Sequence, residues 1–277
     1  MNFINAATKK ERTHVEEIIK SQPVMPHEGI TATEIGICGK QNLFMDVYRP
    51  DNDAEKHPII IDIHGGGLIA GRKEQNQNLA TWFAKEGYLT FAPDYRLVPE
   101  TNVFGQITDV INAFATVAEC AEDFGGDLNQ VFVVADSAGA FLACMASSIL
   151  RYPVKMQPVE DELEENVPEA AKKLVINAMG LQSGMYYIYK GQVGLLQNYY
   201  MSKGWNNHSY AEFIKPETYS KLIPPCYICT GKKDFLKKQT FGFKKCLENE
   251  RVHHDYGFVS KKETVHAFAA LYPESES

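Results

Sequence analysis

The stretch that most constrains the fold lies near the middle of the chain, at residues 131–140. It opens with Val-Phe-Val-Val, a run of apolar and mostly β-branched side chains that is typical of a buried strand. From residue 138 to residue 150 the pattern becomes helical. Ser137 lies at the junction, two residues before Gly139, as the serine does in the G-x-S-x-G elbow. The stretch therefore predicts a sheet that presents a serine hydroxyl at a sharp strand-to-helix turn.

Strand-like and helix-like segments alternate through most of the chain, which predicts an α/β fold with a mostly parallel, doubly wound sheet flanked by helices. Besides the strand before Ser137, strands are predicted at 32–38, 43–48, 58–63, 88–92, 173–179, 225–230 and 254–259. The first two should form a hairpin. Helices are predicted at 8–20, about 75–86, 106–124, 138–150 and about 235–250, with a last one begun by His266.

Residues 182–221 break this alternation and hold nine of the chain's 31 aromatic residues. Connections of this length are usually functional. We predict a single domain of residues 1–277 with two cap elements, one at about 1–25 and one at 182–221. Candidates for an apolar substrate pocket under the cap are Leu68, Tyr186, Tyr187 and Tyr199. The alternative is that the cap's aromatic residues only pack against one another. The acidic run at 160–165 is predicted to be a solvated loop.

Composition narrows the class of protein. The 277 residues are 44% hydrophobic and 23% charged, as in an ordinary globular protein with a sizeable core. A net charge of −7 argues against a nucleic-acid or anionic-membrane surface. No apolar run is long enough to span a membrane or to serve as a signal peptide. The six cysteines are scattered without a framework, so we expect a cytoplasmic protein.

Acyl transfer by a serine needs a base, an acid that orients the base, and donors for the developing oxyanion. His266, after the last predicted strand, is the natural base. Asp234 follows the penultimate strand and is the candidate acid, although an Asp there could instead cap the next helix. Such capping would turn its carboxylate away from His266. Asp255 and Glu263 are weaker alternatives for the acid.

The oxyanion donors are expected from a glycine triplet that directly follows the strand at 58–63. Backbone amides can approach a substrate oxygen closely only where no side chain intrudes. A phosphate-binding loop would use glycines similarly, but the following Lys-Ser/Thr and the G-x-G-x-x-G spacing are missing. We predict an oxyanion hole formed by the amides of Gly66, Gly67 and Ala138, with Gly65 in reserve.

Taken together, these residues resemble the hormone-sensitive-lipase-like branch of the α/β-hydrolase family, which includes bacterial acetyl and carboxylesterases and arylacetamide deacetylase. The resemblance rests on four blocks in order: His64-Gly65-Gly66-Gly67, Asp94-Tyr95-Arg96-Leu97-Val98-Pro99-Glu100, Asp136-Ser137-Ala138-Gly139, and finally Asp234 with His266-Ala267-Phe268. It implies an eight-stranded sheet, with Ser137 as nucleophile, Asp234 as acid and His266 as base. It also implies that His64 and Glu100 support the oxyanion loop. Two departures, Ala135 and Ala140 in place of glycines, should crowd the elbow.

The resemblance implies a serine carboxylesterase that hydrolyses short-chain acyl or aryl esters through an acyl-enzyme, with no metal and no other cofactor. A small-molecule ester is the expected partner, and many relatives pair as homodimers through a sheet edge or an outer helix. Alternatives with the same site are a deacetylase, an amidase or a lipase. A non-catalytic small-molecule-binding protein on this fold is the alternative from another class, and retention of Ser137, Asp234 and His266 argues against it.

Overall fold

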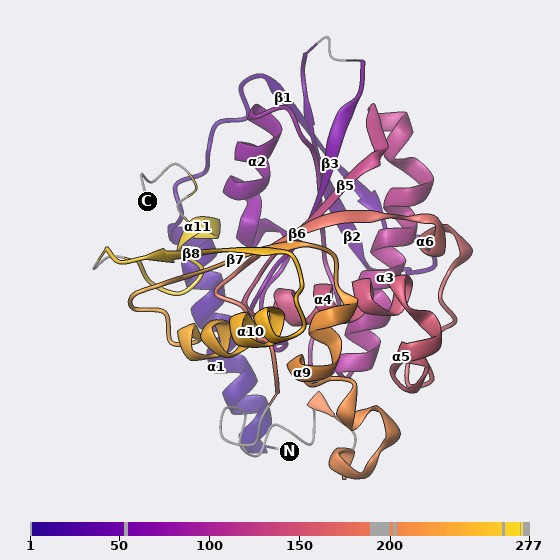
Figure 1. Ribbon diagram of the computed structural model, residues 1–277. Coiled ribbons are helices and arrows are strands. Elements are labelled where there is room, and N and C mark those ends of the chain that lie inside the picture. The colour runs from indigo at the N-terminus through magenta and orange to yellow at the C-terminus, as the bar shows by residue number, and fades with distance from the viewer. Residues whose placement is uncertain are drawn as a thin grey trace.

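The computed structural model describes residues 2–52, 55–188, 200–201, 204–261, 264–271 and 273. One eight-stranded sheet runs through the molecule in the order β1-β2-β4-β3-β5-β6-β7-β8 (Figure 1). β1 and β2 are antiparallel neighbours, β2 is antiparallel to β4, and every further pair is parallel. The strands are β1 Ile30–Gly36, β2 Phe44–Pro50, β3 His57–Ile63, β4 Leu89–Pro93, β5 Gly126–Asp136, β6 Ile176–Gln182, β7 Cys226–Gly231 and β8 His254–Val259. The predicted sheet is confirmed.

Helices flank both faces of this sheet. The α-helices are α1 Asn2–Ser21, α2 Gln77–Lys85, α3 Val103–Cys120, α4 Ser137–Arg151, α5 Pro153–Glu160, α6 Glu169–Lys173, α9 Pro216–Tyr219, α10 Lys237–Asn249 and α11 Phe268–Leu271. Short 3₁₀ turns are η1 Lys73–Asn76, η2 Ala121–Phe124, η4 Trp205–Asn207, η5 Ser209–Glu212 and η6 Ser220–Leu222. In Figure 1, α3, α5 and α6 lie together on one side, and α10 lies below β7 and β8.

Side-chain alternation along the strands divides the core between the two faces. In β2, Met45 and Val47 belong to the large hydrophobic cluster. Tyr48 instead joins a small cluster with Ala80 and Ala84 of α2. Because successive strand residues point to opposite faces, α2 covers one face and the large cluster, which holds most of the α3 and α4 side chains, fills the other.

Several predicted boundaries were wrong: α1 begins at Asn2 and β5 at Gly126, and those of α3 and β6 also differ. The helix predicted at 106–124 begins at Val103, because the side chain of Asn102 accepts hydrogen bonds from the amides of Phe104 (2.9 Å) and Gly105 (3.2 Å). The strand predicted at 173–179 is β6, which runs three residues further, to Gln182. Residues up to Lys173 form α6 instead, whereas Gly180, Leu181 and Gln182 pair with both β5 and β7.

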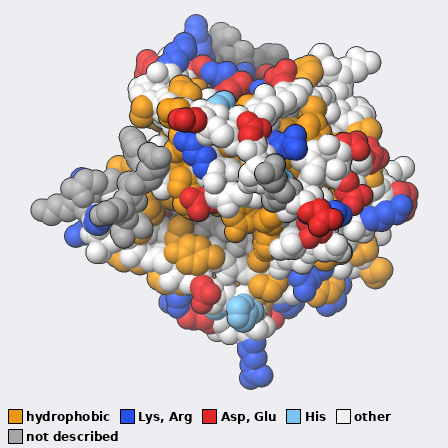
Figure 2. All heavy atoms as spheres, turned by 90° about the horizontal axis from the view of Figure 1, so that it is seen from above, with side chains coloured by type: hydrophobic (Ala, Val, Ile, Leu, Met, Phe, Trp, Pro, Cys, Tyr) orange, Lys and Arg blue, Asp and Glu red, His pale blue; other side chains and the backbone are white. Residues whose placement is uncertain are grey.

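Figure 2 shows one face of the molecule, on which acidic and basic side chains are interspersed and neither sign dominates. Hydrophobic side chains gather near the middle of this face. Among the helices of the described residues, none combines the length and the apolar character that crossing a bilayer requires.

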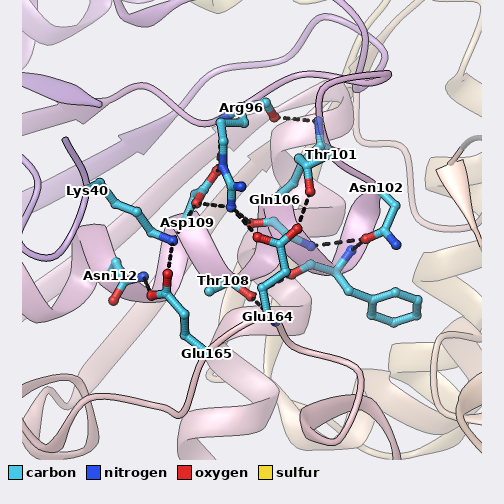
Figure 3. Close-up of polar contacts among 12 residues, drawn as sticks. Lys40, Arg96, Thr101, Asn102, Gln106, Thr108, Asp109, Asn112, Glu164 and Glu165 are labelled. Atoms are coloured by element: carbon cyan, nitrogen blue, oxygen red, sulfur yellow. Dashed lines mark hydrogen bonds and ion pairs between the residues drawn. The ribbon is translucent and has the colours of Figure 1, made fainter. Parts of the chain in front are cut away.

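The acidic run at 160–165 is mostly the exposed turn that we predicted, since Asp161, Glu164 and Glu165 are exposed, but two of its carboxylates are ion-paired. Glu164 accepts hydrogen bonds from Arg96 (2.7 Å) and Thr101 (2.6 Å), and Glu165 pairs with Lys40 (2.7 Å). Figure 3 shows these carboxylates pointing into a polar cluster around Asp109. Its side chain is fully buried and pairs with both Arg96 (2.7 Å) and Lys40 (3.3 Å). This polar cluster, formed by Lys40, Arg96, Thr101, Asp109, Asn112, Glu164 and Glu165, joins the β1–β2 hairpin, the segment after β4, helix α3 and the acidic run.

The predicted cap segment begins directly after β6. Its described parts, 183–188, 200–201 and 204–222, contain only short helical turns, η4, η5, α9 and η6. Tyr186, Tyr200, Tyr210 and Tyr219 are buried in the main core, whereas Tyr187, Trp205 and Phe213 are partly buried against it. Residues 189–199 and 202–203 lie outside the described residues, and with them Tyr199.

Candidate active site

Ser137 stands where β5 turns sharply into α4. Its φ of 49° lies in the left-handed region, which a residue with a side chain adopts only at a cost in free energy. The next residue but one, Gly139, cannot carry a side chain, because a Cβ there would lie 2.1 Å from the carbonyl oxygen of Ile63. Ala135 and Ala140, which we expected to crowd the turn, are fully buried among the core residues. The close approach that demands a glycine is therefore at Gly139.

The three residues of the predicted triad form one hydrogen-bonded chain. His266 Nε2 lies 2.8 Å from Ser137 Oγ, and His266 Nδ1 lies 2.7 Å from Asp234 Oδ1. Since a carboxylate only accepts, Nδ1 carries the proton and Nε2 is left to accept from the serine hydroxyl. Both ends of this hydrogen-bonded triad are buried, since Asp234 is 1% exposed and Ser137 is 7% exposed.

Asp234 orients His266 and caps the following turn at the same time; contrary to expectation, the capping does not turn its carboxylate away from His266. Oδ1 accepts from the Leu236 amide (2.8 Å) as well as from His266, and Oδ2 accepts from Thr230 Oγ1 (2.6 Å). Burial alone would raise the pKa of Asp234, but the hydrogen bonds and charge of His266, with those from Thr230 and Leu236, lower it below its usual value. The carboxylate is therefore ionised at neutral pH.

The two alternative acids do not compete in the described structure. Asp255 lies on the edge strand β8 and is exposed. Glu263 lies outside the described residues.

The glycine triplet after β3 lies beside the elbow. The Gly65 amide donates to Asp136 Oδ1 (2.9 Å), so it is not available as the reserve oxyanion donor. Gly66 and Gly67 have φ values of 111° and 62°, and a Cβ on Gly66 would lie 2.0 Å from the Ala70 carbonyl oxygen. Ala138 is in the first turn of α4, where amides have no partner within the helix. These three amides can serve a substrate oxygen.

The loop after the triplet is held in a strained form by distant residues. Leu68 has a φ of 68°, and its carbonyl accepts from Gln106 Nε2 (2.8 Å) and the Val98 amide (2.9 Å). From α1, Arg12 donates to the carbonyls of Ile69 (2.8 Å) and Val98 (3.2 Å). No local sequence signal marks Arg12 or Gln106, because each acts on a segment far away in the chain. We call residues 65–70 the oxyanion loop.

His64 and Glu100, expected to support the oxyanion loop, contribute unequally. His64 is buried, its Nδ1 donates to the Gly65 carbonyl (2.7 Å), and its ring stacks on Tyr95 at 4.3 Å. Burial lowers the pKa of His64 to about 4, so the ring is neutral. The hydroxyl of Tyr95 donates to the carbonyls of His64 (2.9 Å) and Gly65 (3.1 Å). Glu100 is exposed and acts only through its ion pair with Arg12 (3.2 Å).

A buried polar group also lies behind the elbow. Asn76 Nδ2 donates both to Asp136 Oδ1 (3.0 Å) and to Asp62 Oδ1 (3.1 Å). Burial raises the pKa of both carboxyl groups. Asp136 thus fixes Gly65 from one side and is itself fixed by Asn76.

The residues predicted to contact substrate differ in how deeply they are buried. Leu68 is 1% exposed and Tyr186 is 0% exposed, with its ring stacked on Phe243 at 4.0 Å. Both side chains pack in the core. For Tyr186, such packing is the alternative that the sequence left open. Tyr187 is partly buried and packs against the core.

Gln182, the last residue of β6, and Ser183, directly after it, hold the segment that follows His266. Sequence reasoning missed both. Ser183 Oγ accepts from the Ala267 amide (3.0 Å), and Gln182 Oε1 accepts from the Ala269 amide (3.1 Å). Ser183 and Ala267 both have positive φ, 50° and 54°. The available signal was positional, because polar residues at the carboxyl end of a central strand face the same edge as Ser137.

Comparison with known proteins identifies the family of this chain. The BD-FAE family model matches residues 45–240. The chain is 26% identical over 205 residues to isoprenylcysteine alpha-carbonyl methylesterase ICME of Arabidopsis thaliana, covering 69% of this chain and 46% of that protein. It is 27% identical over 204 residues to esterase LipQ of Mycobacterium tuberculosis, covering 72% and 47%. The chain thus spans about half the length of these curated relatives.

Among solved structures, esterase B from Lactobacillus Rhamnosis superposes with a TM-score of 0.84 at 19% identity, covering 99% of this chain and 89% of that one. The esterase of the archaeon Pyrobaculum calidifontis gives a TM-score of 0.67 at 19% identity, covering 98% and 88%. Likeness at this identity shows the fold. The expected resemblance is confirmed: since the family model matches more than half of the chain, the protein belongs to the BD-FAE family and has the α/β-hydrolase fold.

Proposed function

We propose that the protein is a serine carboxylesterase acting on short-chain acyl or aryl esters. The observation that carries this proposal is the unbroken hydrogen-bonded chain from Ser137 Oγ through His266 to Asp234 Oδ1, with distances of 2.8 and 2.7 Å. The relatives named above, which are methylesterases and esterases, support the same class of reaction.

Acylation begins as Ser137 Oγ attacks the ester carbonyl and His266 Nε2 takes its proton. Asp234 keeps the imidazole in the tautomer with a proton on Nδ1 and stabilises the imidazolium. The amides of Gly66, Gly67 and Ala138 donate to the oxyanion of the tetrahedral intermediate, which forms only during reaction. His266 then gives the proton to the leaving alkoxide as its C–O bond breaks, and the acyl group stays on Ser137.

Water completes the cycle by the same route. His266 Nε2 removes a proton from a water that attacks the acyl-enzyme, and the second tetrahedral intermediate uses the same donors. Its collapse releases the carboxylic acid and returns the proton to Ser137 Oγ.

We assign α1 and the described parts of residues 182–221 to the cap over this site. Each is tied to the catalytic elements directly: Arg12 of α1 holds the oxyanion loop, and the Met185 amide donates to the carbonyl of Ser137 itself (2.8 Å).

The decisive experiment compares wild type with S137A on p-nitrophenyl acetate and butyrate. Removing the nucleophile should lower kcat roughly a millionfold, as it does in other serine hydrolases. The matched control is S147A, which also removes a buried hydroxyl from helix α4 but leaves the nucleophile. Full activity in S137A would contradict the proposed mechanism.

The same assay, extended to a panel, separates the alternative functions. A series of acyl chain lengths, an acetylated sugar and an anilide should show fastest hydrolysis for short acyl esters. A maximum on long chains, acetylated sugars or the anilide would instead indicate a lipase, a deacetylase or an amidase. Binding without hydrolysis of any of them would indicate a receptor-like protein.

A further inference from the structure

Phe235 is an exposed aromatic residue in contact with the base of the triad. It directly follows Asp234 in the sequence and is 74% exposed. The centroid of its ring lies 4.2 Å from that of the His266 imidazole, with the two planes inclined by 35°. A single exposed aromatic residue is ordinary on a protein surface, but this one borders the imidazole of the proposed catalytic base.

Two other exposed aromatic side chains, Phe241 and Phe258, contact rings of neighbouring residues. Phe241, in α10, packs its ring at 6.1 Å from Phe258 and 6.4 Å from Tyr256, both in β8. These three cover one another at the edge of the sheet. Phe235 instead lies against the imidazole that hydrogen-bonds to Ser137.

The chemistry of the reaction identifies which part of the substrate meets this ring. His266 Nε2 gives its proton to the oxygen of the departing alcohol, so that oxygen must come within hydrogen-bond reach of Nε2. The acyl carbonyl oxygen meanwhile lies at the amides of Gly66, Gly67 and Ala138. The group that neighbours the imidazole is therefore the alcohol portion of the ester.

Resting on the proposed function, we propose that Phe235 is the wall of the alcohol subsite and selects esters whose alcohol carries a flat, apolar ring. An aryl or benzyl group on the leaving oxygen can stack on Phe235 and cover its exposed face. A methyl group is too small to reach that face.

The test compares benzyl acetate with methyl acetate, which share the acyl group and release alcohols of nearly equal acidity. The readout is the ratio of the two kcat/KM values in wild type, F235A, F235L and the control F258A. Ring stacking is worth about a factor of three to ten. We expect F235A to lower the benzyl-to-methyl ratio roughly five- to tenfold, F235L to lower it by less, and F258A to leave it unchanged.

The outcomes separate this inference from the function on which it rests. If wild type hydrolyses both esters and F235A leaves the ratio unchanged, Phe235 does not contact the alcohol and the assignment is overturned. An equal loss on both esters also overturns it, and would mean that Phe235 only positions His266. If wild type hydrolyses neither ester, the proposed carboxylesterase function itself is wrong.

Discussion

At the scale of single residues, the site contains backbone conformations and a protonation state that are unfavourable in an unfolded, solvated chain. Ser137, Leu68, Ser183 and Ala267 all have positive φ without being glycine, and such strain persists only where the surroundings fix it. His64 is a neutral imidazole in the core. Its Nδ1 is satisfied by Gly65, and its buried Nε2 has no hydrogen-bond partner among the described residues.

The buried His64 predicts a loss of stability in acid. Its pKa is about 4 in the folded protein against an ordinary value of 6.5, so between these values the unfolded chain binds a proton that the folded chain does not. The free energy of unfolding therefore falls as pH falls through this window, by up to roughly 3 kcal/mol.

The measurement is urea unfolding of wild type and H64Q at several pH values from 7 to 4. H64Q lacks the titrating group, so the stability advantage of wild type should narrow as the pH falls. The buried carboxyl groups of Asp62 and Asp136 are present in both proteins, which removes their opposite contribution from the comparison. An advantage that stays constant across the range would mean that His64 takes up no proton on unfolding.

At the scale of elements, helix α1 is part of the catalytic architecture. Arg12 reaches from it to the carbonyls of both Ile69 and Val98, and Glu16 of the same helix pairs with Arg72 (3.1 Å), just beyond the oxyanion loop. A helix attached in this way determines where the loop's amides lie.

Replacing Arg12 should therefore slow the chemical step more than it weakens substrate binding. R12A leaves the loop with fewer restraints, and because its amides act on an oxyanion present only during reaction, kcat should fall roughly ten- to a hundredfold with little change in KM. R12K lacks the guanidinium fork, so its kcat should lie between those of R12A and wild type. The control is K20A, which removes an exposed cation from the same helix. A loss seen only in KM would contradict the positioning role.

At the scale of the whole molecule, the polar cluster of Figure 3 holds together segments far apart in the chain. Lys40, Asp109 and Glu164 come from the first hairpin, from α3 and from the acidic run, and Arg96 contacts the last two. Arg96 also lies in the segment that supports the oxyanion loop, because Gln106 bridges the carbonyls of Arg96 and Leu68 (2.8 Å each).

Arg96 pairs with both Asp109 and Glu164, and these two ion pairs should contribute unequally to stability because Asp109 is buried. R96M leaves that carboxylate with Lys40 as its one remaining cation and should lower the free energy of unfolding by about 3 kcal/mol. E164Q alters a half-exposed pair and should cost less than about 1 kcal/mol. Urea denaturation of both variants measures the difference, and equal small losses would show that Asp109 does not need Arg96.

What the sequence could predict follows the same division of scales. The order of strands and helices follows from local hydrophobic patterns, and Ser137, His266 and Asp234 follow from motifs at the ends of strands. The contacts of Arg12, Gln106 and Ser183 could not be predicted, because each joins segments 38 to 86 residues apart. For the same reason the ion pairs of the exposed acidic run could not be predicted: its partners Lys40 and Arg96 are distant in sequence. The burial of Leu68 and Tyr186, two of the predicted pocket residues, could not be predicted either, because residue type does not reveal it.

The hydrogen bond from the Met185 amide to the Ser137 carbonyl has an evolutionary consequence. The segment that follows β6 and leads into the cap is fastened to the nucleophile's own peptide group. A lineage that reshapes residues 183–187 to admit a different ester also shifts the turn that carries the hydroxyl. New selectivity in this chain is therefore most accessible through substitutions outside that segment, such as at Phe235 beside the imidazole.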